Sequence, residues 1–299
     1  MSSLPPLPTV KEYNPTSDDI AEAEQLISKA AEVSEFWAEK YEKDAVKNWD
    51  LFYKRNRTNF FKDRHYLVTE FGEVARSDSF IDANEATGLL VEVGCGVGNA
   101  VIPLAQACPK ISILATDCSS IAIDLLNERL EAEDPSVARR ISTRVLDATS
   151  THFPPEDLLG SADFVLLLFC LSAISEAHYS SIVEGVRKIL RPGGIVLFRD
   201  YGKYDLAQLR FSKDKGRAAT ASRLPGEDDF YVRQDGTRAK FFTEDSLVEL
   251  WERQGGFQRV ELFTHRRCVI NRKQGKEMKR VWIQAKWRAP LADGSKVSR

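Results

Sequence analysis

Runs of branched aliphatic residues recur through the middle of the chain, at 89–93, 111–116, 141–146, 164–170 and 195–198. Continuous apolar runs of this length are typical of strands that are buried on both faces of a sheet. The segments between them have helical composition, so strand and helix alternate along the chain. Such alternation predicts an α/β fold, with a parallel sheet covered by helices.

Weaker patterns predict what lies on either side of this unit. Residues 1–16 are rich in proline and serine and are expected to be disordered, whereas 20–46 has apolar residues at helical spacing after a capping sequence at 17–19. A helix at 69–80, a hairpin turning at Asp235 and Gly236, a helix from Thr243 to about Gln254 and two antiparallel strands near 257–270 and 279–287 complete the prediction. We therefore divide the chain into a disordered start (1–16), an N-terminal helical segment (17–80), the α/β domain (81–289) and a flexible tail (290–299).

The first apolar run ends in a carboxylate, Glu92, and a loop with glycines at Gly94, Gly96 and Gly98. Glycine lets a backbone approach a ligand closely, and strand, loop and helix N-terminus together make a nucleotide-type site. A dinucleotide-binding loop has the spacing G-x-G-x-x-G. The spacing G-x-G-x-G behind an acidic residue instead resembles the first motif of class I S-adenosylmethionine (SAM) methyltransferases. The methionine end of SAM is cationic, so Glu92 is a candidate contact; a glycine-rich turn without a ligand is the alternative.

Two more of the predicted strands end in acidic residues. Asp117 lies about twenty residues beyond the glycines, where a carboxylate can accept both hydroxyls of a ribose. The alternative is that Asp117 caps the helix that starts near Ser119. The strand at 141–146 is followed by Asp147 and Ala148, the position at which methyltransferases bind the adenine amino group.

Aromatic and basic residues alternate between 48 and 66 without a clear helical or strand period. Aromatic rings beside cations provide stacking platforms next to phosphate-binding groups, which is typical of nucleic-acid contact. The alternative is a lid whose aromatics, such as Trp49 and Phe52, only seal the core. The candidate nucleic-acid contacts in this block are Phe60, Phe61, Lys62, Arg64 and His65.

The net charge of −2 does not by itself indicate a nucleic-acid binder. The segment 259–288, however, contains ten basic residues and only two acidic ones, Glu261 and Glu277. A local basic surface of this kind can hold a phosphate backbone. A solvated hairpin face is the alternative.

Cysteine, histidine and apolar content exclude several classes of protein. The five cysteines include no C-x-x-C pair and the four histidines are scattered, so we expect a reducing compartment, no disulfide framework and no metal. The longest apolar run, 164–174, is short for a membrane span, and no secretory pattern is present at the start. We expect a soluble protein of the cytoplasm, with the nucleus as a second location, and no membrane partner.

Five segments together resemble one family, the eukaryotic tRNA N3-methylcytidine methyltransferases of the methyltransferase-like group. They are NWDLFYKRN (48–56), NFFKDRH (59–65), GCGVGN (94–99), LFRDYG (197–202) and FYVRQDGTR (230–238). The likeness covers roughly 45–287. It implies a class I, Rossmann-like fold with a seven-stranded, mostly parallel sheet whose last strand is antiparallel, plus an N-terminal helical extension.

The resemblance also implies an activity, methyl transfer from SAM to N3 of cytidine 32 in the anticodon stem-loop of tRNA. The length and the lack of an extra RNA-binding domain look more like the branch that acts on serine tRNAs, similar to enzymes helped by seryl-tRNA synthetase, with threonine or arginine tRNAs as alternatives. Trp49 and Tyr53 would close over the cofactor. Its pocket would be lined by Gly94, Asp117, Asp147, Ala148 and Leu168.

The chemistry of the reaction suggests which residues take part. N3 of neutral cytosine carries a lone pair, so the enzyme must mainly unstack the base and align it with the methyl group. Methylation leaves a cationic base, which a nearby carboxylate would stabilise. Asp200 is the candidate, with Tyr201 orienting or stacking and Arg199 beside it; a structural ion pair between Arg199 and Asp200 is the alternative. Arg233 and Arg238, next to the hairpin turn, are candidate phosphate contacts.

Two functions of other classes stay open. A small-molecule or protein methyltransferase would keep the cofactor site without binding phosphates, and steep salt dependence of substrate binding would count against it. A catalytically silent RNA-binding adaptor would share the fold, and undetectable SAM binding would support that function.

Overall fold

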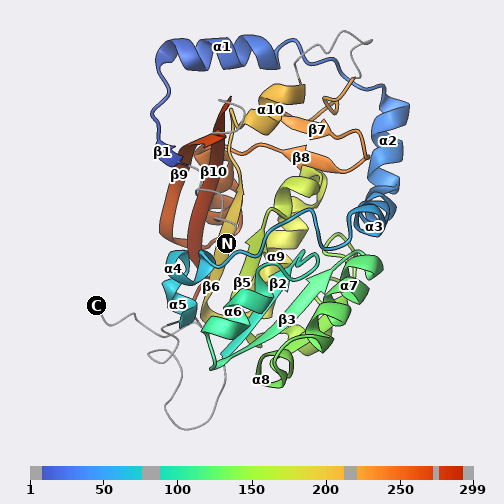
Figure 1. The fold of residues 1–299 in the computed structure, drawn as a ribbon, viewed down its shortest axis with the longest axis vertical. Helices are drawn as coiled ribbons and strands as arrows, with labels where there is room; N and C mark the ends of the chain where they lie inside the picture. Colours follow the sequence, from blue (N-terminus) through green and yellow to red (C-terminus); the bar gives the residue numbers. More distant parts are fainter. Residues whose placement is uncertain (1–8, 76–87, 212–220, 272–275, 292–299) are drawn as a thin grey trace, which may run out of the picture.

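The computed structural model describes residues 9–75, 88–211, 221–271 and 276–291 (Figure 1). Within these residues the main feature is an eight-stranded sheet in the order β1-β9-β10-β6-β5-β2-β3-β4. Strands β4, β3, β2, β5 and β6 pair in parallel with their neighbours. Strand β10 pairs antiparallel with β6, β9 pairs antiparallel with β10, and β1 pairs antiparallel with β9. The strands are β1 (Thr9–Glu12), β2 (Gly88–Val93), β3 (Ile111–Asp117), β4 (Ile141–Val145), β5 (Ala162–Leu168), β6 (Leu190–Tyr201), β9 (Gln258–Asn271) and β10 (Lys276–Arg288). The predicted α/β class, with a mostly parallel sheet and an antiparallel last strand, is confirmed. The predicted count of seven strands is one too few for the described residues, because β1 adds an edge strand beside β9.

The connections around β2 create a crevice at one edge of the sheet. The chain passes from β2 to β3 and β4 on one side and then returns to β5 and β6 on the other side. Loops that leave neighbouring strands in opposite directions open a crevice at the carboxyl ends, where open α/β sheets bind ligands. The loops after β2, β3 and β5 therefore define where a site is expected.

Helices cover both faces of the sheet because successive residues of each strand point to opposite sides. Val91 of β2 packs in one cluster with Ile182 of α9, whereas its neighbour Leu90 packs in another with Ile102 of α6. The helices of this region are α6 (Val101–Ala107), α7 (Ser120–Glu131), α8 (Pro135–Ala138), α9 (Tyr179–Ile189), α11 (Glu244–Val248) and the π-helical turn Glu249–Gln254, with 3-10 turns at Glu156–Leu158, Leu171–Ala173 and Glu176–His178. Thr243 caps α11 through its side chain, as predicted.

The N-terminal segment forms three helices, and the single helix predicted for 20–46 is divided between the first two of them. They are α1 (Ser17–Ile27), α2 (Glu35–Lys43) and α3 (Ala45–Asn56), which border the sheet domain along two of its sides (Figure 1). The chain is extended between α1 and α2 because Val33 N donates to the carbonyl of Arg223 at 2.9 Å and Glu32 pairs with the Arg223 guanidinium at 2.7 Å. These tertiary contacts outweigh a helical propensity that amounts to tenths of a kcal/mol per residue.

The predicted disorder of 1–16 is wrong for the part that the structure describes. Residues Thr9–Glu12 form β1, which pairs with β9, and Thr16 caps α1 in a capping box with Asp19. Edge pairing supplies backbone hydrogen bonds that composition alone does not reveal. Residues 1–8 and the predicted flexible tail from 292 onward lie outside the described residues.

In the described part of the chain, five of the ten basic residues at 259–288 pair with acidic groups of the chain itself. Ion pairs join Arg267 to Glu12, Lys279 to Asp19 and Arg280 to the buried Asp205. Arg259 and Lys286 pair with Glu252 and Glu261. The N-terminal segment thus neutralises part of a surface that the sequence analysis considered for phosphate binding.

The remaining elements connect the sheet to the N-terminal segment. The hairpin predicted around Gly236 is present as β7 (Phe230–Val232) and β8 (Arg238–Lys240), next to α10 (Leu206–Phe211). The helix predicted for 69–80 is present as two short helices, α4 (Leu67–Glu70) and α5 (Gly72–Ala75), and its remainder lies outside the described residues.

Two stacked indoles at the centre of one core give a test of this packing. Trp251 and Trp287 are fully buried, with ring centroids 5.0 Å apart and an interplanar angle of 14°. Trp251→Ala should lower the free energy of unfolding by about 3–5 kcal/mol, because it removes a large buried side chain and leaves a cavity. Phe36→Ala, at a ring that is 67% exposed, should change it by less than about 0.5 kcal/mol. Urea titration measures both values, and equal effects would contradict the packing described.

Candidate active site

The glycine loop after β2 needs glycine for two separate reasons. Gly94 and Gly96 have φ of +77° and +55°, which L side chains rarely adopt. A Cβ on Gly94 would also lie 2.6 Å from the Cys170 sulfur, and one on Gly96 would lie 2.6 Å from the Tyr53 hydroxyl. Gly98 has φ of +82° but packs against Leu126 and faces none of the described cavities. The first two glycines shape the site, whereas Gly98 shapes the turn.

Asp117 joins this loop to the next strand and helix. Its carboxylate accepts hydrogen bonds from the backbone N–H of Gly96 at 2.8 Å and of Ser119 at 2.9 Å. The helix cap of α7 is Ser119, whose hydroxyl accepts from Ala122 N, so the alternative in which Asp117 is the cap is wrong. Burial raises the pKa of Asp117 to about 6.

Glu92 is a buried carboxylate with an unsatisfied oxygen. Among the described residues, its Oε2 atom has no hydrogen-bond partner. Burial raises the pKa of Glu92 to about 8, and the Arg64 guanidinium opposes this rise. A buried carboxylate that lacks a partner costs free energy unless a cationic group meets it. The arrangement therefore fits a positively charged ligand group at the end of β2.

Two adjacent cavities lie over these carboxylates. The first cavity, of about 280 Å³, includes Asp117, Asp147 and Ala148 in its wall. The second cavity includes Glu92, Gly96 and Leu168. Both share four wall residues, Trp49, Tyr53, Gly94 and Phe169. Nine of the ten predicted cofactor contacts thus line one or both of these adjoining cavities, with Gly98 the exception.

Helix α3 supplies the aromatic wall of both cavities. Trp49 and Tyr53 stack with ring centroids 5.8 Å apart, and Phe52 packs against both rings. The spacing of 49, 52 and 53 is helical, so the expectation of no helical period is wrong for this part of the block. The helix is fastened over the site, because Ser119 Oγ donates to Asp50 at 2.6 Å and Asn48 Nδ2 donates to the carbonyl of Gly236 at 3.1 Å.

The five aromatic and basic residues that follow α3 divide into two groups. Phe60, Lys62 and His65 are exposed, as a nucleic-acid contact requires, and Phe60 is 58% exposed. Phe61 and Arg64 instead form part of the wall of the second cavity. The sequence assigned all five to one role, whereas the structure separates an outer group from an inner one.

Neither predicted arginine of the hairpin projects freely into solvent. Arg238 is buried, pairs with Glu42 of α2 and forms part of the wall of the first cavity. Arg233 is half-buried, and its guanidinium donates to the carbonyl of Arg238 at 2.7 Å and lies 5.8 Å from the Tyr201 ring centroid. The contacts of Arg238 favour a structural role over phosphate binding.

Asp200 is fully buried and forms part of the wall of none of the described cavities. It accepts hydrogen bonds from the backbone N–H of Ser172 at 2.9 Å and of Tyr201 at 2.8 Å. Burial raises the pKa of Asp200 to about 6. As placed, this carboxylate fixes the turn after β5, and its predicted contact with a base stays a prediction.

Arg199 points to the opposite side of β6 from Asp200. Its guanidinium lies 4.8 Å from the Tyr66 ring and 5.3 Å from the Trp282 ring, and it pairs with Glu70 at 3.6 Å. Successive strand residues face opposite sides, so no ion pair with Asp200 forms, and this alternative is wrong. These contacts place the Arg199 side chain away from the two cavities.

Phe169 is a wall residue that the sequence analysis missed. It follows β5 directly, has φ of +52° and borders both cavities. Its ring centroid lies 4.9 Å from that of Tyr201. Non-glycine residues with positive φ are strained and are found preferentially at functional sites. Its place at the carboxyl end of a central strand was the signal that could have revealed it.

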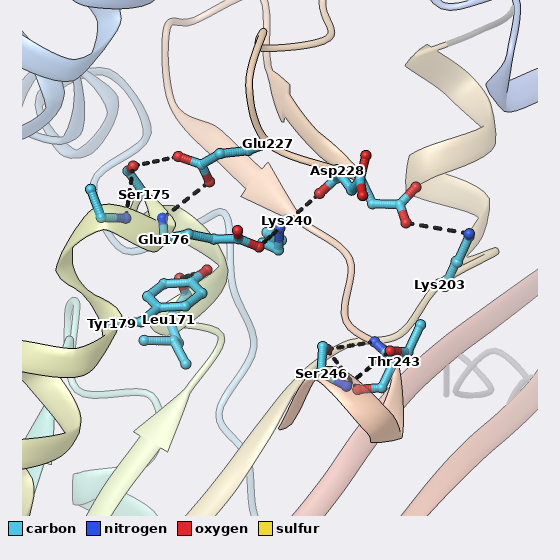
Figure 2. Close-up of polar contacts among 12 residues, drawn as sticks. Leu171, Ser175, Glu176, Tyr179, Lys203, Glu227, Asp228, Lys240, Thr243 and Ser246 are labelled. Atoms are coloured by element: carbon cyan, nitrogen blue, oxygen red, sulfur yellow. Dashed lines mark hydrogen bonds and ion pairs between the residues drawn. The ribbon is translucent and has the colours of Figure 1, made fainter. Parts of the chain in front are cut away.

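A polar cluster holds the hairpin against the segment that follows Phe169. Figure 2 shows Lys240 between Glu176, with which it pairs, and the carbonyl of Asp228, to which it donates at 2.7 Å. Ser175 and Glu227 are joined by a second hydrogen bond. Ala173 and Ile174, just before this cluster, form part of the wall of the first cavity. The cluster therefore stabilises one wall of the site.

In the part of the chain that the structure describes, no group of three or more histidine, cysteine, aspartate or glutamate residues is placed to hold a metal ion. None of the described helices has the length and apolarity needed to cross a membrane.

Comparison with known proteins agrees with this fold. The family described as "Methyltransferase domain" matches residues 91–196. A solved SAM-dependent methyltransferase from Anabaena variabilis covers 87% of this chain and 97% of its own, with a TM-score of 0.55 at 14% identity. Another from Methanosarcina mazei gives a TM-score of 0.51 at 20% identity, covering 70% of this chain and 95% of its own. The fold and the paired cavities define a class I SAM-dependent methyltransferase, and its cofactor is SAM.

Relatives in sequence narrow the assignment. Human tRNA N(3)-cytidine methyltransferase METTL6 is 41% identical over 92% of this chain and 91% of its own. The Mettl2 enzyme of Drosophila melanogaster is 40% identical over 85% of this chain and 74% of its own. The trm141 enzyme of Schizosaccharomyces pombe is 37% identical over 88% of this chain and 99% of its own. The chain belongs to the tRNA N3-cytidine methyltransferase family.

The raised pKa of Glu92 predicts that removing its charge stabilises the protein without SAM but weakens the binding of SAM. A carboxyl group whose folded pKa lies above its unfolded value contributes stability below the unfolded pKa, and this contribution is lost as pH rises through the folded pKa. For Glu92 that window runs from about 4.5 to about 8. Without SAM, Glu92→Gln should therefore melt at a higher temperature than the wild type at pH 8, with the difference vanishing near pH 4.5.

The same substitution should weaken SAM binding at least tenfold, because the ammonium group loses its ionised partner. Calorimetric melting at the two pH values and a binding titration at pH 7 measure both effects. Glu39→Gln, at an exposed carboxylate of α2, is the control and should change neither. A Glu92→Gln protein that melts below the wild type at pH 8, or that binds SAM equally well, would contradict the role of Glu92.

Proposed function

We propose that the enzyme methylates N3 of cytidine 32 in the anticodon loop of serine tRNAs. The cavities beneath Trp49 and Tyr53 carry the proposal, because they combine a site for the methyl donor with exposed aromatic and basic groups at its edge. The names of the relatives at about 40% identity support tRNA cytidine as the acceptor. Serine tRNA as substrate, and help from seryl-tRNA synthetase, rest on the resemblance of sequence motifs alone.

Phe169 and Tyr201 are suited to receive a flipped base. Their rings lie in contact at the end of β5 and β6, and Phe169 also borders the region of both cavities. Enzymes that modify a base take it out of the stack and hold it between apolar or aromatic groups. We assign Phe169 and Tyr201 to one side of this stacking site.

The protein needs little acid–base chemistry, because N3 of cytosine attacks through its own lone pair. The residues must instead exclude water and hold the base in line. We propose that Asp200 acts by fixing the backbone of Ser172 and Tyr201, whose positions determine where the base lies. Its negative charge near the modified base would also favour the cationic product.

The outer group of Phe60, Lys62 and His65 is suited to contact the nucleotides around the target. These side chains are exposed, and Phe60 packs edge-on against Phe52 and Phe61. Aromatic rings stack on unpaired bases and cations bind their phosphates in single-stranded loops of RNA. An anticodon loop offers such unpaired bases.

Methyl transfer to unmodified tRNA tests the proposed function. Labelled SAM is incubated with unmodified serine, threonine and arginine tRNAs, with and without seryl-tRNA synthetase, and the nucleosides are then separated. Label should appear in N3-methylcytidine of serine tRNA, and more of it with the synthetase present.

Two variants make this experiment specific to the site. Asp117→Ala should lose both SAM binding and label, because it removes the group that holds the glycine loop. Asp200→Asn should bind SAM within about threefold of the wild type but transfer the methyl group at least tenfold more slowly. Label in a nucleoside other than N3-methylcytidine, or in none despite SAM binding, would contradict the proposed function.

A further inference from the structure

The position of Arg64 differs from that of the other basic residues in its segment. Lys62 and His65 are exposed, whereas Arg64 is half-buried and forms part of the wall of the second cavity with Glu92 and Asn99. From their sequence positions, all three cations are candidate contacts for RNA. The structure places only Arg64 next to the carboxylate at the end of β2.

Backbone and side-chain contacts hold Arg64 in this position. Its backbone N–H donates to the carbonyl of Asn99 at 2.8 Å. The neighbouring carboxylate, Asp63, accepts from Asn99 Nδ2 at 2.9 Å and from Arg129 at 2.9 and 3.1 Å. Arg129 in turn donates to the carbonyl of Val97 at 2.8 Å. The loop that carries Arg64 is thus fastened to the glycine loop through residues 63 and 64.

The guanidinium itself is left without a polar partner in the described part of the chain. Its centre lies 4.8 Å from the ring centroid of Phe169, a stacking contact that leaves the edge N–H groups available. Asp63 does not neutralise it, because Arg129 and Asn99 already bind that carboxylate. A guanidinium in the wall of a cavity, with its N–H groups free, is suited to bind an oxyanion.

The second cavity therefore has a cation and an unsatisfied carboxylate in one wall. Glu92 Oε2 lacks a partner, and no hydrogen bond or ion pair joins Glu92 to Arg64 in the described residues. One ligand group satisfies both side chains, an α-amino acid with its ammonium and carboxylate on a single carbon. The methionine end of SAM is such a group.

We propose that Arg64 binds the α-carboxylate of the methionine moiety of SAM while Glu92 binds its ammonium. Arg64 is then a cofactor-binding residue rather than a contact for RNA phosphate. The guanidinium fork matches a carboxylate in two parallel hydrogen bonds. Because Phe60 and Lys62 lie in the same segment, cofactor binding also positions the outer group for tRNA. The proposal depends on SAM as the cofactor of the proposed function, but not on which nucleotide accepts the methyl group.

A cofactor analogue without the carboxylate tests the pairing directly. Binding of SAM and of decarboxylated SAM is measured by calorimetric titration, in the absence of tRNA, for the wild type and Arg64→Gln. The wild type should bind decarboxylated SAM about 10- to 100-fold more weakly than SAM, as expected for loss of charge-assisted hydrogen bonds. Arg64→Gln should bind SAM more weakly by a similar factor and bind decarboxylated SAM as the wild type does.

Two further variants keep this result interpretable. Lys54→Gln changes an exposed cation of α3 to which no role is assigned, and it should bind both ligands as the wild type does. Arg64→Lys keeps the charge without the fork and should fall between the wild type and Arg64→Gln for SAM. Thermal melting of each variant verifies that the protein is folded.

Two outcomes would overturn the proposal. One is an equal loss of affinity for both ligands in Arg64→Gln, which would indicate that the side chain only supports the cavity. The other is unchanged SAM binding in Arg64→Gln, which would show that the guanidinium does not bind the carboxylate of the cofactor. Because the titration contains no tRNA, neither outcome depends on whether cytidine N3 is the acceptor.

Discussion

One buried carboxylate, Asp117, connects most parts of the site. It accepts hydrogen bonds from Gly96 and Ser119, so the glycine loop, the end of β3 and the start of α7 move together. Ser119 then donates to Asp50, which ties α3 to the same point. If this carboxylate were lost, the glycine loop beside the cavities would lose its contact with β3. The attachment of α3 through Ser119 would be weakened as well.

The N-terminal segment has an inner and an outer part that its sequence does not separate. Helix α3 places Trp49 and Tyr53 over the cofactor region, and the residues after it place Phe60 and Lys62 at the surface. Asp63, between the two groups, is bonded to Asn99 and Arg129 of the sheet domain. A single piece of chain is therefore in contact with the donor site on one side and available to an RNA loop on the other.

The sheet and the cofactor site could be predicted from sequence because their signals are local. Apolar runs, alternating glycines and acidic strand ends each follow from what a buried parallel strand and a tight loop require. The strand β1 could not be predicted, because it forms through backbone pairing to a strand more than 250 residues away. The break between α1 and α2 depends on contacts with Arg223, which helical periodicity cannot reveal.

The directions in which side chains point were the other feature that could not be predicted from the sequence. Arg199 and Asp200 are adjacent in sequence and were given related roles, yet strand geometry turns them to opposite sides of β6. Arg64 was grouped with Lys62 and His65 because the three are close in sequence, but one of them faces inward. Phe169 carried no compositional signal, and its importance appears only from its backbone conformation and its place in both cavity walls.

The central claim is that the two cavities are one SAM site closed by α3. Hydrogen–deuterium exchange with and without SAM tests it most directly, because exchange reports local opening of each backbone segment. We predict that SAM slows exchange in the glycine loop 94–99 and, to a comparable degree, in 45–56 and 60–64. Slower exchange in the glycine loop alone, with no change in 45–56 and 60–64, would contradict the claim.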